Sequence, residues 1–467
     1  MAKKQSQSRS IIRTDFFSRY FSLSVKFSKQ LQNNIFPISN FGKAILIFAF
    51  AFLPFASFSQ SYNYVNYCLD TLTSKTMSGR GYQDDADKKA ATFIANELQA
   101  NGVKQINISY FQPFDIQINN INSAVLKLHN KDSIKQIGVD FVVSGTSPSC
   151  DIELIKAKAI VFNSKSQTDN IKKDKLNNKV LIFNQDFKNK NATPLSYRDI
   201  ILYLRELKKE KIVPKLVIIQ GFDKIQYPIS TSVGKYPTLL LKGCDLSTKI
   251  DYLHLTIEAK YEDKYQTQNV WAMVEGTQCK DSFFVFTAHY DHLGRVGEAY
   301  YPGAADNASG TSVVLDLARS YAQNPAEYSV LFIFFSGEEI GLLGSYYAAA
   351  NPLIDLTKIK FLFNLDMCGT GSGGVAVING QKERRAGELL QKINDENHYF
   401  LKVNLGEESC NSDHCPFIQK GVPAHFLFTY GCEYNEYHTI YDDGKELGFT
   451  KHLDFCNLLK EFVRRYR

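Results

Sequence analysis

A strand-like segment that ends on several ionisable side chains is the first sign of chemistry in this sequence. The stretch FFVFTAHYDHLG, residues 283–294, runs from apolar residues directly into His289, Asp291 and His292. Burying such groups without partners costs free energy, because the groups lose their hydration. We therefore expect this strand end to bind something that compensates for the lost water.

The same arrangement recurs at other strand ends in the second half of the chain. The apolar runs SVLFIFF and KFLFNL are each followed by carboxylates, a further aspartate opens the helix-like segment PGAADNASGTSVVLDLA, and a histidine lies in the late loop YNEYHTIYDD. The residues concerned are Glu338, Glu339, Asp366, Asp306 and His438. In open α/β sheets, ligands bind beyond the carboxyl ends of the strands, so we expect these groups to meet at one edge.

Metal ions are the simplest explanation for this gathering of carboxylates and imidazoles. Taken singly, each residue has an ordinary alternative, such as a helix N-cap or a surface histidine. Together they would repel one another and lose hydration unless cations neutralise them. Imidazole and carboxylate without thiolate favour Zn²⁺, with Co²⁺ or Mn²⁺ as possible substitutes. A pair of ions about 3.5–4 Å apart, with one carboxylate bridging them, would suit a hydrolytic site.

Hydrolysis also needs a base that does not bind the metal. Glu338 and Glu339 are consecutive, and consecutive side chains at a strand end point in different directions. One of them can therefore bind metal while the other takes a proton from water. Asp291 lies two residues from His289, where it could accept the ring N–H and orient that ligand.

The elements around these residues indicate an α/β fold. From residue 266 onward, the apolar strands NVWAMVEG, FFVFTA, SVLFIFF, KFLFNLD and AHFLFT alternate with segments of helical character. Continuous apolar runs are typical of strands buried on both faces. We expect helices at 307–322, 340–350, 383–397 and 449–465, and an earlier amphipathic helix within 85–102. The prediction is a mostly parallel mixed sheet flanked by helices.

Residues 139–265 differ from the rest of the chain in their sequence pattern and are predicted to form a small β-rich inserted domain. Short β-like runs such as NNKVLIFNQ alternate there with loops rich in Lys, Asn and Asp, and a single helix is expected near 197–211. The alternative is that these runs add strands to one large sheet. The predicted organisation is a leader and signal peptide at 1–59, the first part of the main domain at 60–138, the insert at 139–265, and the rest of the main domain at 266–467.

Most of the positive charge lies in the leader. The formal net charge is +6, but residues 1–59 hold eight Lys or Arg against one acid, so they carry +7 and leave the remainder near −1. No basic face for nucleic acid is implied. The apolar stretch KAILIFAFAFLPFASFSQS behind this basic flank resembles a secretory signal peptide. We expect export to the periplasm or beyond, with no stable membrane span in the mature chain; the alternative is an uncleaved N-terminal anchor.

The nine cysteines match no zinc-binding or CxxC pattern. In an oxidising compartment some of them should form disulfides. Cys410 and Cys415 are close in sequence, but the sequence alone does not say which cysteines pair.

The motifs TAHYDH, GAADNASGTSVVLDLAR, SGEEIGLLGS, NLDM, SDHCPFIQKGVPA and YHTIYDD resemble those of the zinc-dependent M28 peptidase family, which contains aminopeptidases of the leucyl type. The early segment MSGRGYQDDADKKAATFIANELQANGVK resembles the opening of that family. The likeness covers roughly 70–138 and 266–465, and it implies the phosphorylase/hydrolase-like fold of zinc exopeptidases. By position, the insert resembles the protease-associated domain found in several members.

The resemblance implies two zinc ions and five protein ligands. His289 and Asp366 would hold one ion, Glu339 and His438 would hold the other, and Asp306 would bridge them.

The same likeness implies the roles of two further carboxylates, with Glu338 as the general base and Asp291 as the residue that orients a histidine ligand. One feature departs from the leucyl-type pattern, because no tyrosine precedes the SDH segment to stabilise the tetrahedral intermediate. Tyr437, Ser412 and His414 are alternative donors.

The function implied by the resemblance is an aminopeptidase that removes N-terminal residues from peptides or proteins by metal-activated water. A glutaminyl cyclase-like acyltransferase with one zinc shares much of this motif set and is the main alternative. A carboxypeptidase or dipeptidase on the same scaffold is another. A non-enzymatic receptor-like relative would be expected to lack ligands, and none is missing here.

Overall fold

The computed structural model describes residues 61–467, except 186–192, 244–245 and 446. The predicted leader and signal peptide, 1–59, lies outside these residues. Val65–Arg467 forms one unit, and the description below concerns that unit. Within the described part of the chain, no helix is both long and apolar enough to cross a membrane.

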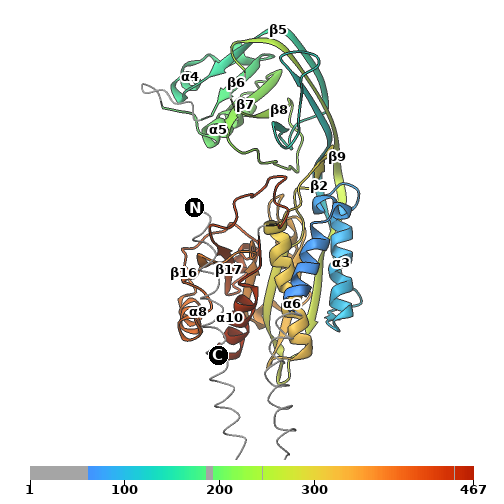
Figure 1. Cartoon of the computed structure of the whole chain (residues 1–467), viewed down its shortest axis with the longest axis vertical. Coiled ribbons are helices and arrows are strands. Elements are labelled where there is room, and N and C mark those ends of the chain that lie inside the picture. The colour runs from blue at the N-terminus through green and yellow to red at the C-terminus, as the bar shows by residue number, and fades with distance from the viewer. Residues whose placement is uncertain (1–60, 186–192, 244–245, 446) are drawn as a thin grey trace, which may run out of the picture. The chain divides into compact units, whose positions relative to one another are not determined.

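A mixed sheet positions the predicted site (Figure 1). Its strands are, in spatial order, β16 (Val403–Leu405), β15 (Gly374–Ile378), β17 (Ala424–Tyr430), β14 (Ile359–Leu365), β10 (Cys279–His289), β13 (Tyr328–Phe335) and β9 (Lys249–Val274). β10 runs parallel to β13 and β14, and β14 runs parallel to β17. β9 and β15 run antiparallel to their neighbours β13 and β17. The predicted mostly parallel, mixed α/β sheet is confirmed.

The central strands are buried because their sequences are apolar on both faces. Every residue of β13 is buried, as is the second half of β10 from Phe284 to His289. Such strands need cover on both sides of the sheet. Helices supply that cover, and Figure 1 shows α3, α6 and α10 packed along the sheet.

Besides the helical residues 61–72, the helices of this part are α3 (Ala86–Ala100), α6 (Gly310–Gln323), α7 (Leu343–Ala350), α8 (Arg384–Asn397), α9 (Cys415–Gln419) and α10 (His452–Arg465). Five of them match predicted helices, but α6, α7 and α10 begin three residues later than expected. The displaced starts of α6 and α7 have a common reason: the residues just before them carry predicted site groups in a non-helical backbone. Asp306, for example, has φ −112° and ψ 103°.

The insert is built on two long strands that also belong to the main sheet. β2 (Phe111–Leu128) pairs with β9 from Phe111 opposite Val270 to Leu128 opposite Leu253. The remaining strands are β5 (Cys150–Phe162), β6 (Val180–Asn184), β7 (Leu216–Phe222), β8 (Thr238–Lys242) and β4 (Phe141–Val143). Hydrogen bonding continues from β9 through β5 to this group.

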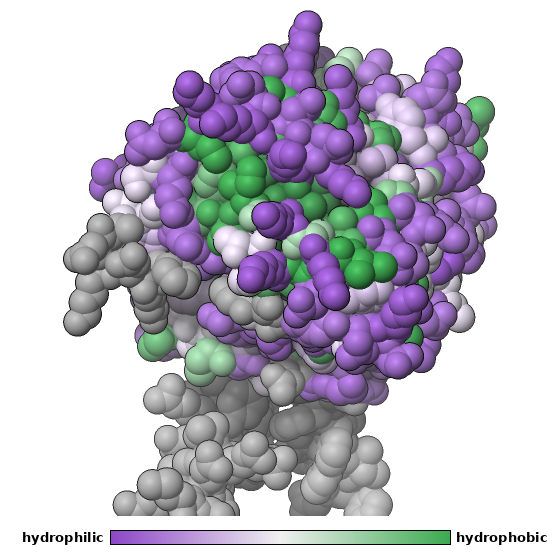
Figure 2. All heavy atoms as spheres, turned by 90° about the horizontal axis from the view of Figure 1, so that it is seen from above, coloured by the Kyte–Doolittle hydropathy of each residue, from purple (hydrophilic) through white to green (hydrophobic). Residues whose placement is uncertain are grey.

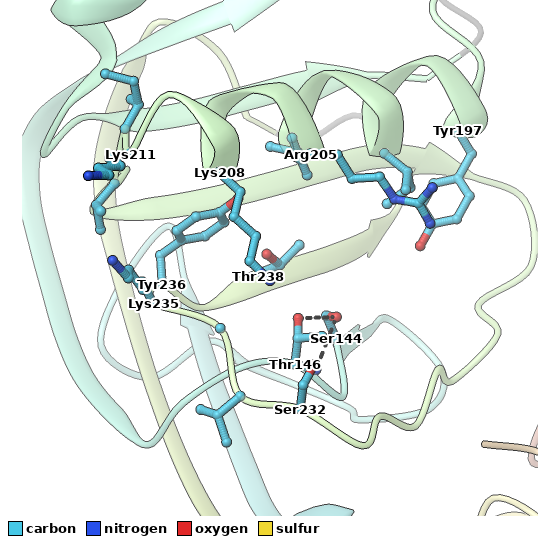
Figure 3. A pocket seen from close by; sticks show the side chains of 16 residues that line it. Ser144, Thr146, Tyr197, Arg205, Lys208, Lys211, Ser232, Lys235, Tyr236 and Thr238 are labelled. Atoms are coloured by element: carbon cyan, nitrogen blue, oxygen red, sulfur yellow. Dashed lines mark hydrogen bonds between the residues drawn. The ribbon is translucent and has the colours of Figure 1, made fainter. Parts of the chain in front are cut away.

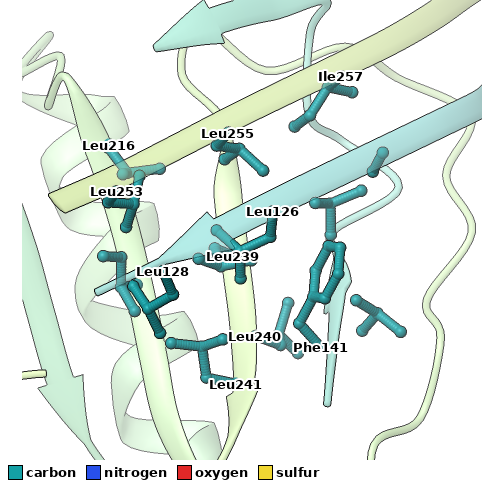
Figure 4. Close-up of a cluster of buried hydrophobic side chains, with 14 of the residues drawn as sticks. Leu126, Leu128, Phe141, Leu216, Leu239, Leu240, Leu241, Leu253, Leu255 and Ile257 are labelled. Atoms are coloured by element: carbon teal, nitrogen blue, oxygen red, sulfur yellow. The ribbon is translucent and has the colours of Figure 1, made fainter. Parts of the chain in front are cut away.

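The insert has a hydrophobic cluster of its own (Figure 4), formed by side chains from both long strands and from the shorter ones. It includes Leu126, Leu128, Phe141, Leu239 and Leu255. Because β2 contributes to this cluster from Ile121 onward, the packing of the insert begins earlier in the chain than residue 139. The domain boundaries given above stay a prediction.

Helix α5 (Tyr197–Lys209) covers the insert's parallel strands and corresponds to the helix expected near 197–211. It begins with a capping box, in which the Ser196 hydroxyl accepts from the Asp199 amide and the Asp199 carboxylate accepts from the Ser196 amide. A second, shorter helix, α4 (Lys165–Asn170), was not expected from the sequence. Seen from the end that carries the insert, hydrophilic side chains surround a hollow with a hydrophobic floor (Figure 2).

The shorter elements are η1 (Lys75–Arg80), β1 (Lys104–Gln105), β3 (Ile134–Lys135), η2 (Lys173–Leu176), β11 (Arg295–Val296), β12 (Ala299–Tyr300), η3 (Ala304–Ser309) and η4 (Leu356–Lys358).

Candidate metal centre

Parallel strands end at one level of the sheet and bring the predicted ligands together. His289 at the end of β10 lies opposite Phe335 at the end of β13, and Thr287 lies opposite Asn364 of β14. The segments after β13 and β14, which carry the predicted carboxylates, therefore begin at the same edge. All five predicted metal ligands meet there: His289, Asp306, Glu339, Asp366 and His438.

The Asp306 carboxylate lies between two histidines. Its Oδ1 is 3.1 Å from Nε2 of His289, and its Oδ2 is 3.0 Å from Nε2 of His438. The residue is 4% exposed, and its peptide bond to Asn307 is cis. A carboxylate whose two oxygens face two different imidazoles is arranged as a bridge between two cations would require.

A first group of possible ligands surrounds His289. Its Nε2 is 3.4 Å from Oδ1 of Asp366 and 4.0 Å from Oε2 of Glu338. One donor atom from each of these three residues lies within 4.8 Å of the others.

A second group surrounds Glu339 and includes Asp306. Oε2 of Glu339 is 3.2 Å from Nε2 of His438, and Oε1 is 2.6 Å from Nδ1 of His292. Together with Asp306, these residues also place one donor atom each within 4.8 Å of the others. The two groups pair His289 with Asp366 and Glu339 with His438, which is the pairing that the family resemblance implies.

The electrostatics show that this pocket attracts positive charge. Burial by itself lowers the pKa of His289, but Asp366 and Glu338 outweigh burial and raise that pKa well above its ordinary value. Burial favours a protonated Glu339, yet His438 and His292 lower its pKa to about 2. Buried imidazole and carboxylate groups of this kind fit a zinc site by their donor chemistry.

Glu338 differs from the ligands around it. Burial raises the pKa of its carboxyl group well above the ordinary value, and repulsion from Asp413, Glu339 and Asp366 adds to that effect. Its side chain is 15% exposed, more than that of Asp366 at 11% or Glu339 at 4%. A partly accessible carboxyl group with a raised pKa is suited to receive and return a proton.

Asp291 lies beneath the two glutamates and fixes their backbone. Its carboxylate accepts hydrogen bonds from the amides of Glu338 at 3.2 Å and Glu339 at 3.4 Å, and from the Tyr82 hydroxyl at 2.7 Å. Its Oδ1 is 3.7 Å from Nδ1 of His289, whereas the Asp291 carbonyl oxygen is 3.2 Å from that nitrogen. In this structure, Asp291 can thus orient the histidine through its carbonyl and the glutamates through its carboxylate.

Two charged residues hold the backbone on which Asp306 is mounted. Asp442 accepts hydrogen bonds from the amides of Ala305 at 2.8 Å and Asp306 at 3.3 Å. The fully buried Arg80 guanidinium donates to five carbonyl oxygens, those of Leu72, Tyr290, Pro302, Gly303 and Asp306. Gly303 has φ +61°, and a Cβ there would lie 2.4 Å from the Asp306 carbonyl oxygen, so this turn requires glycine.

Two residues near the site were not given a role from the sequence. His292 contacts the Glu339 carboxylate. Its position in the HYDH motif, next to predicted site residues, was the sequence signal for a role in the site. Asp413 is fully buried, and burial together with Asp291 and Asp366 raises its pKa to about 7, although His289 and Ser345 act in the opposite direction. Only the three-dimensional fold brings Asp413 to this edge, because it follows β16 rather than one of the central strands.

The insert contacts the segment that carries His438. The Lys224 ammonium group lies 2.8 Å from the Glu436 carboxylate and also donates to the Asn435 carbonyl oxygen. Gln226 donates to the Tyr437 carbonyl at 3.3 Å, and the amide of Tyr227 donates to the His438 carbonyl at 3.4 Å. The insert therefore helps to fix the backbone of residues 435–438, which includes a predicted ligand.

The three alternative donors for a developing oxyanion occupy different environments. The Ser412 hydroxyl donates to Asp366 at 2.9 Å, and Nε2 of His414 is 2.9 Å from the Ser409 carbonyl. Tyr437 stacks on His438 with ring centroids 3.7 Å apart, and its hydroxyl has no hydrogen-bond partner among the described residues. Cys410 and Cys415, next to this segment, form a disulfide.

Comparison with known proteins shows a similarity that includes the residues of this site. Residues 269–459 match the model of peptidase family M28. The chain is 30% identical over 252 residues to aminopeptidase YwaD of Bacillus subtilis. This match covers 52% of this chain and 50% of that protein. It is 34% identical over 197 residues to a probable zinc metalloprotease of Pyrenophora teres f. teres, covering 33% of this chain and 40% of that protein. The matches thus span about half or less of these relatives.

Solved structures share the fold. BSAP, a zinc aminopeptidase from Bacillus subtilis, superimposes with a TM-score of 0.66 at 21% identity, covering 86% of this chain and 94% of that chain. A peptidase M28 precursor from Shewanella amazonensis gives a TM-score of 0.65 at 16% identity, covering 88% and 97%. The main sheet and its helices make up a smaller share of the chain than either match covers. Both matches therefore extend over the insert as well.

Proposed function

We propose that this chain is a zinc aminopeptidase of peptidase family M28, whose model residues 269–459 match, and that it holds two metal ions in its active site. The observation that carries this proposal is the position of Asp306, whose two oxygens lie 3.1 and 3.0 Å from the Nε2 atoms of His289 and His438. His289 and Asp366 would hold one zinc ion, and Glu339 and His438 the other.

Bound zinc would polarise the scissile carbonyl and acidify a water molecule. Glu338 accepts the proton of the attacking water and later passes it to the leaving amine, as the peptide C–N bond breaks. Its partial exposure and raised pKa suit both transfers. Asp291 keeps the glutamate backbone in place, and the carboxylates around the site provide the negative potential that attracts a free amino terminus.

Tyr437 is proposed as the donor to the oxygen of the tetrahedral intermediate. Burial raises the pKa of its hydroxyl, and the carboxylates of Asp306, Glu339, Asp366 and Glu338 add to the rise, so the hydroxyl remains protonated near the site. The ring is 42% exposed, which leaves it accessible to substrate. Losing one such donor typically costs on the order of 10²–10³ in kcat.

Tyr437→Phe should lower kcat by that order and leave KM nearly unchanged. Tyr441→Phe is the matched control, because Tyr441 lies on the same segment and is 55% exposed. Equal kcat values for both variants would remove Tyr437 from the mechanism.

The proposed activity is tested with a panel of aminoacyl and dipeptidyl fluorogenic substrates. Cleavage of the aminoacyl substrates should stop with a chelator, return with zinc, and fail when the substrate amino group is acetylated. Cleavage of acetylated peptides from the carboxyl end would support a carboxypeptidase instead. Release of a cyclised product from peptides with N-terminal Gln, without hydrolysis of other substrates, would support the cyclase alternative.

We also propose that the chain is exported through the segment 1–59. The basic flank and apolar stretch of that segment support this proposal. Fractionation of cells that make the full chain, followed by N-terminal sequencing of the exported form, tests it. An intact N-terminus found only in the cytoplasm would contradict export.

A further inference from the structure

The insert contains a cavity of about 480 Å³ that takes no part in the proposed metal centre. It lies between α5 and the segment 231–238, and Figure 3 shows side chains of the helix projecting toward that segment. Four basic residues line it: Arg205, Lys208, Lys211 and Lys235. No carboxylate side chain is among its lining residues.

The rest of the cavity lining combines apolar and hydroxyl groups. Ile201, Leu204 and Val213 contribute aliphatic surface, and the rings of Tyr197 and Tyr236 flank it. The hydroxyls of Ser144, Thr146 and Ser232 lie at the side opposite the helix. Such a lining can bury apolar side chains and can also bond to peptide groups.

The charges of α5 are segregated by sign. Glu206 and Glu210 are salt-bridged to Lys173, with distances of 3.2 and 2.7 Å, and are not part of the cavity lining. Within the described part of the chain, the four basic residues of the cavity have no acidic partner. Arg205 and Lys208 lie three residues apart and are neighbours on one face of α5, where like charges repel. Lys211 follows just after the end of that helix.

This arrangement leaves an uncompensated positive face over an apolar hollow, although the chain after residue 59 is close to neutral overall. We propose that the cavity binds an acidic polypeptide segment in which Asp or Glu alternates with apolar residues. The carboxylates would pair with the four basic side chains, and the apolar side chains would enter the hollow between the tyrosine rings. An inorganic anion would use the charge but not the apolar surface. The proposal concerns binding alone and does not depend on the catalytic assignment.

The test is fluorescence anisotropy with the full chain. The probe is a labelled ten-residue peptide of alternating Glu and Leu, acetylated at its N-terminus so that an aminopeptidase cannot shorten it. A matched peptide carries Gln in place of Glu. The acidic peptide should bind, and its affinity should fall with rising salt because the contacts are ionic.

Charge reversal in the cavity should weaken binding of the acidic peptide. The variant Arg205→Glu/Lys208→Glu should lose roughly tenfold or more in affinity, since two exposed ion pairs become repulsions. The control is Lys172→Glu/Lys175→Glu, which makes the same change of charge on exposed insert residues outside the cavity. The milder Arg205→Gln/Lys208→Gln variant, with circular dichroism for all variants, separates loss of charge from misfolding.

Several results would overturn the proposal. These are equal binding of the Glu and Gln peptides, an equal loss in the control variant, or no binding of the acidic peptide at millimolar concentration. Binding of phosphatidylglycerol vesicles or of an oligonucleotide that depends on Arg205 and Lys208, without binding of the acidic peptide, would also overturn it and assign the cavity to another ligand.

Discussion

Replacing Arg80 by lysine should loosen the turn that carries Asp306. The guanidinium donates to five carbonyl oxygens at distances of 2.5 to 3.2 Å, inside a site where it is fully buried. Burial lowers the pKa of Arg80 to about 10, so the group is still charged at neutral pH. A lysine keeps the charge but has three N–H donors on one atom.

The magnitude follows from this count of donors. Lysine leaves at least two of the five carbonyls without their arginine partner, and an unsatisfied buried polar group costs about 1–3 kcal/mol. Arg80→Lys should therefore destabilise the fold by about 2–6 kcal/mol. Because the turn holds Asp306, zinc affinity should also fall, by about 10–100-fold as is usual for groups that support a metal ligand.

The assay combines thermal unfolding of the metal-free protein with competition for zinc against a chelator. Arg295→Lys is the matched control, because the Arg295 guanidinium is 37% exposed and pairs with Asp84 at 2.8 Å near the surface. It should cost no more than about 1 kcal/mol and leave zinc affinity unchanged. The reasoning would be refuted if the Arg80→Lys protein unfolded at the same temperature as the control variant and bound zinc as tightly as the wild type.

Three further outcomes follow from the structure. Glu338→Gln should bind zinc normally but lose nearly all turnover, and substantial hydrolysis by a zinc-loaded variant would exclude Glu338 as the base. Burial lowers the pKa of His425 to about 3 from an ordinary 6.5. Between these two pKa values the unfolded chain binds a proton that the folded chain does not. The free energy of unfolding is therefore highest above about pH 6.5 and decreases by up to about 1.4 kcal/mol for each pH unit below it. His425→Phe should reduce this loss in urea unfolding between pH 7 and 4.5, and parallel pH profiles for both proteins would contradict it. Lys224→Ala should weaken zinc binding by a few fold, because the exposed Lys224–Glu436 pair contributes at most about 1 kcal/mol. Lys382→Ala, which removes an exposed pair elsewhere, should leave zinc binding unchanged.

The central sheet and the residues at its edge could be predicted because the signal for them is local. A short apolar run such as β13 is typical of a strand buried on both faces, and the polar residue that follows it is then expected at the end of that strand. On this basis His289 and Asp366 were predicted to lie at one edge of the sheet. In the structure, Nε2 of His289 is 3.4 Å from Oδ1 of Asp366. The family likeness supplied their pairing, which strand patterns alone left open.

The supports of the site could not be predicted because they act over long separations in sequence. Arg80 lies more than two hundred residues before the carbonyls of Pro302 and Gly303 that it contacts, and no local pattern marks such a bond. The contacts from Lys224 to the segment around His438 depend likewise on how the insert folds back. The core of the insert begins within β2, and no turn or change in composition marks that point in the sequence, because one continuous strand serves both parts.

The most direct measurement is the zinc content of the purified chain at saturation, determined by inductively coupled plasma mass spectrometry together with peptide hydrolysis. The two donor groups that meet at Asp306 predict two zinc ions per chain and the loss of both tight sites in Asp306→Ala. A fully active protein that saturates with a single zinc ion, or an Asp306→Ala variant that retains two, would contradict the proposed bridged metal centre.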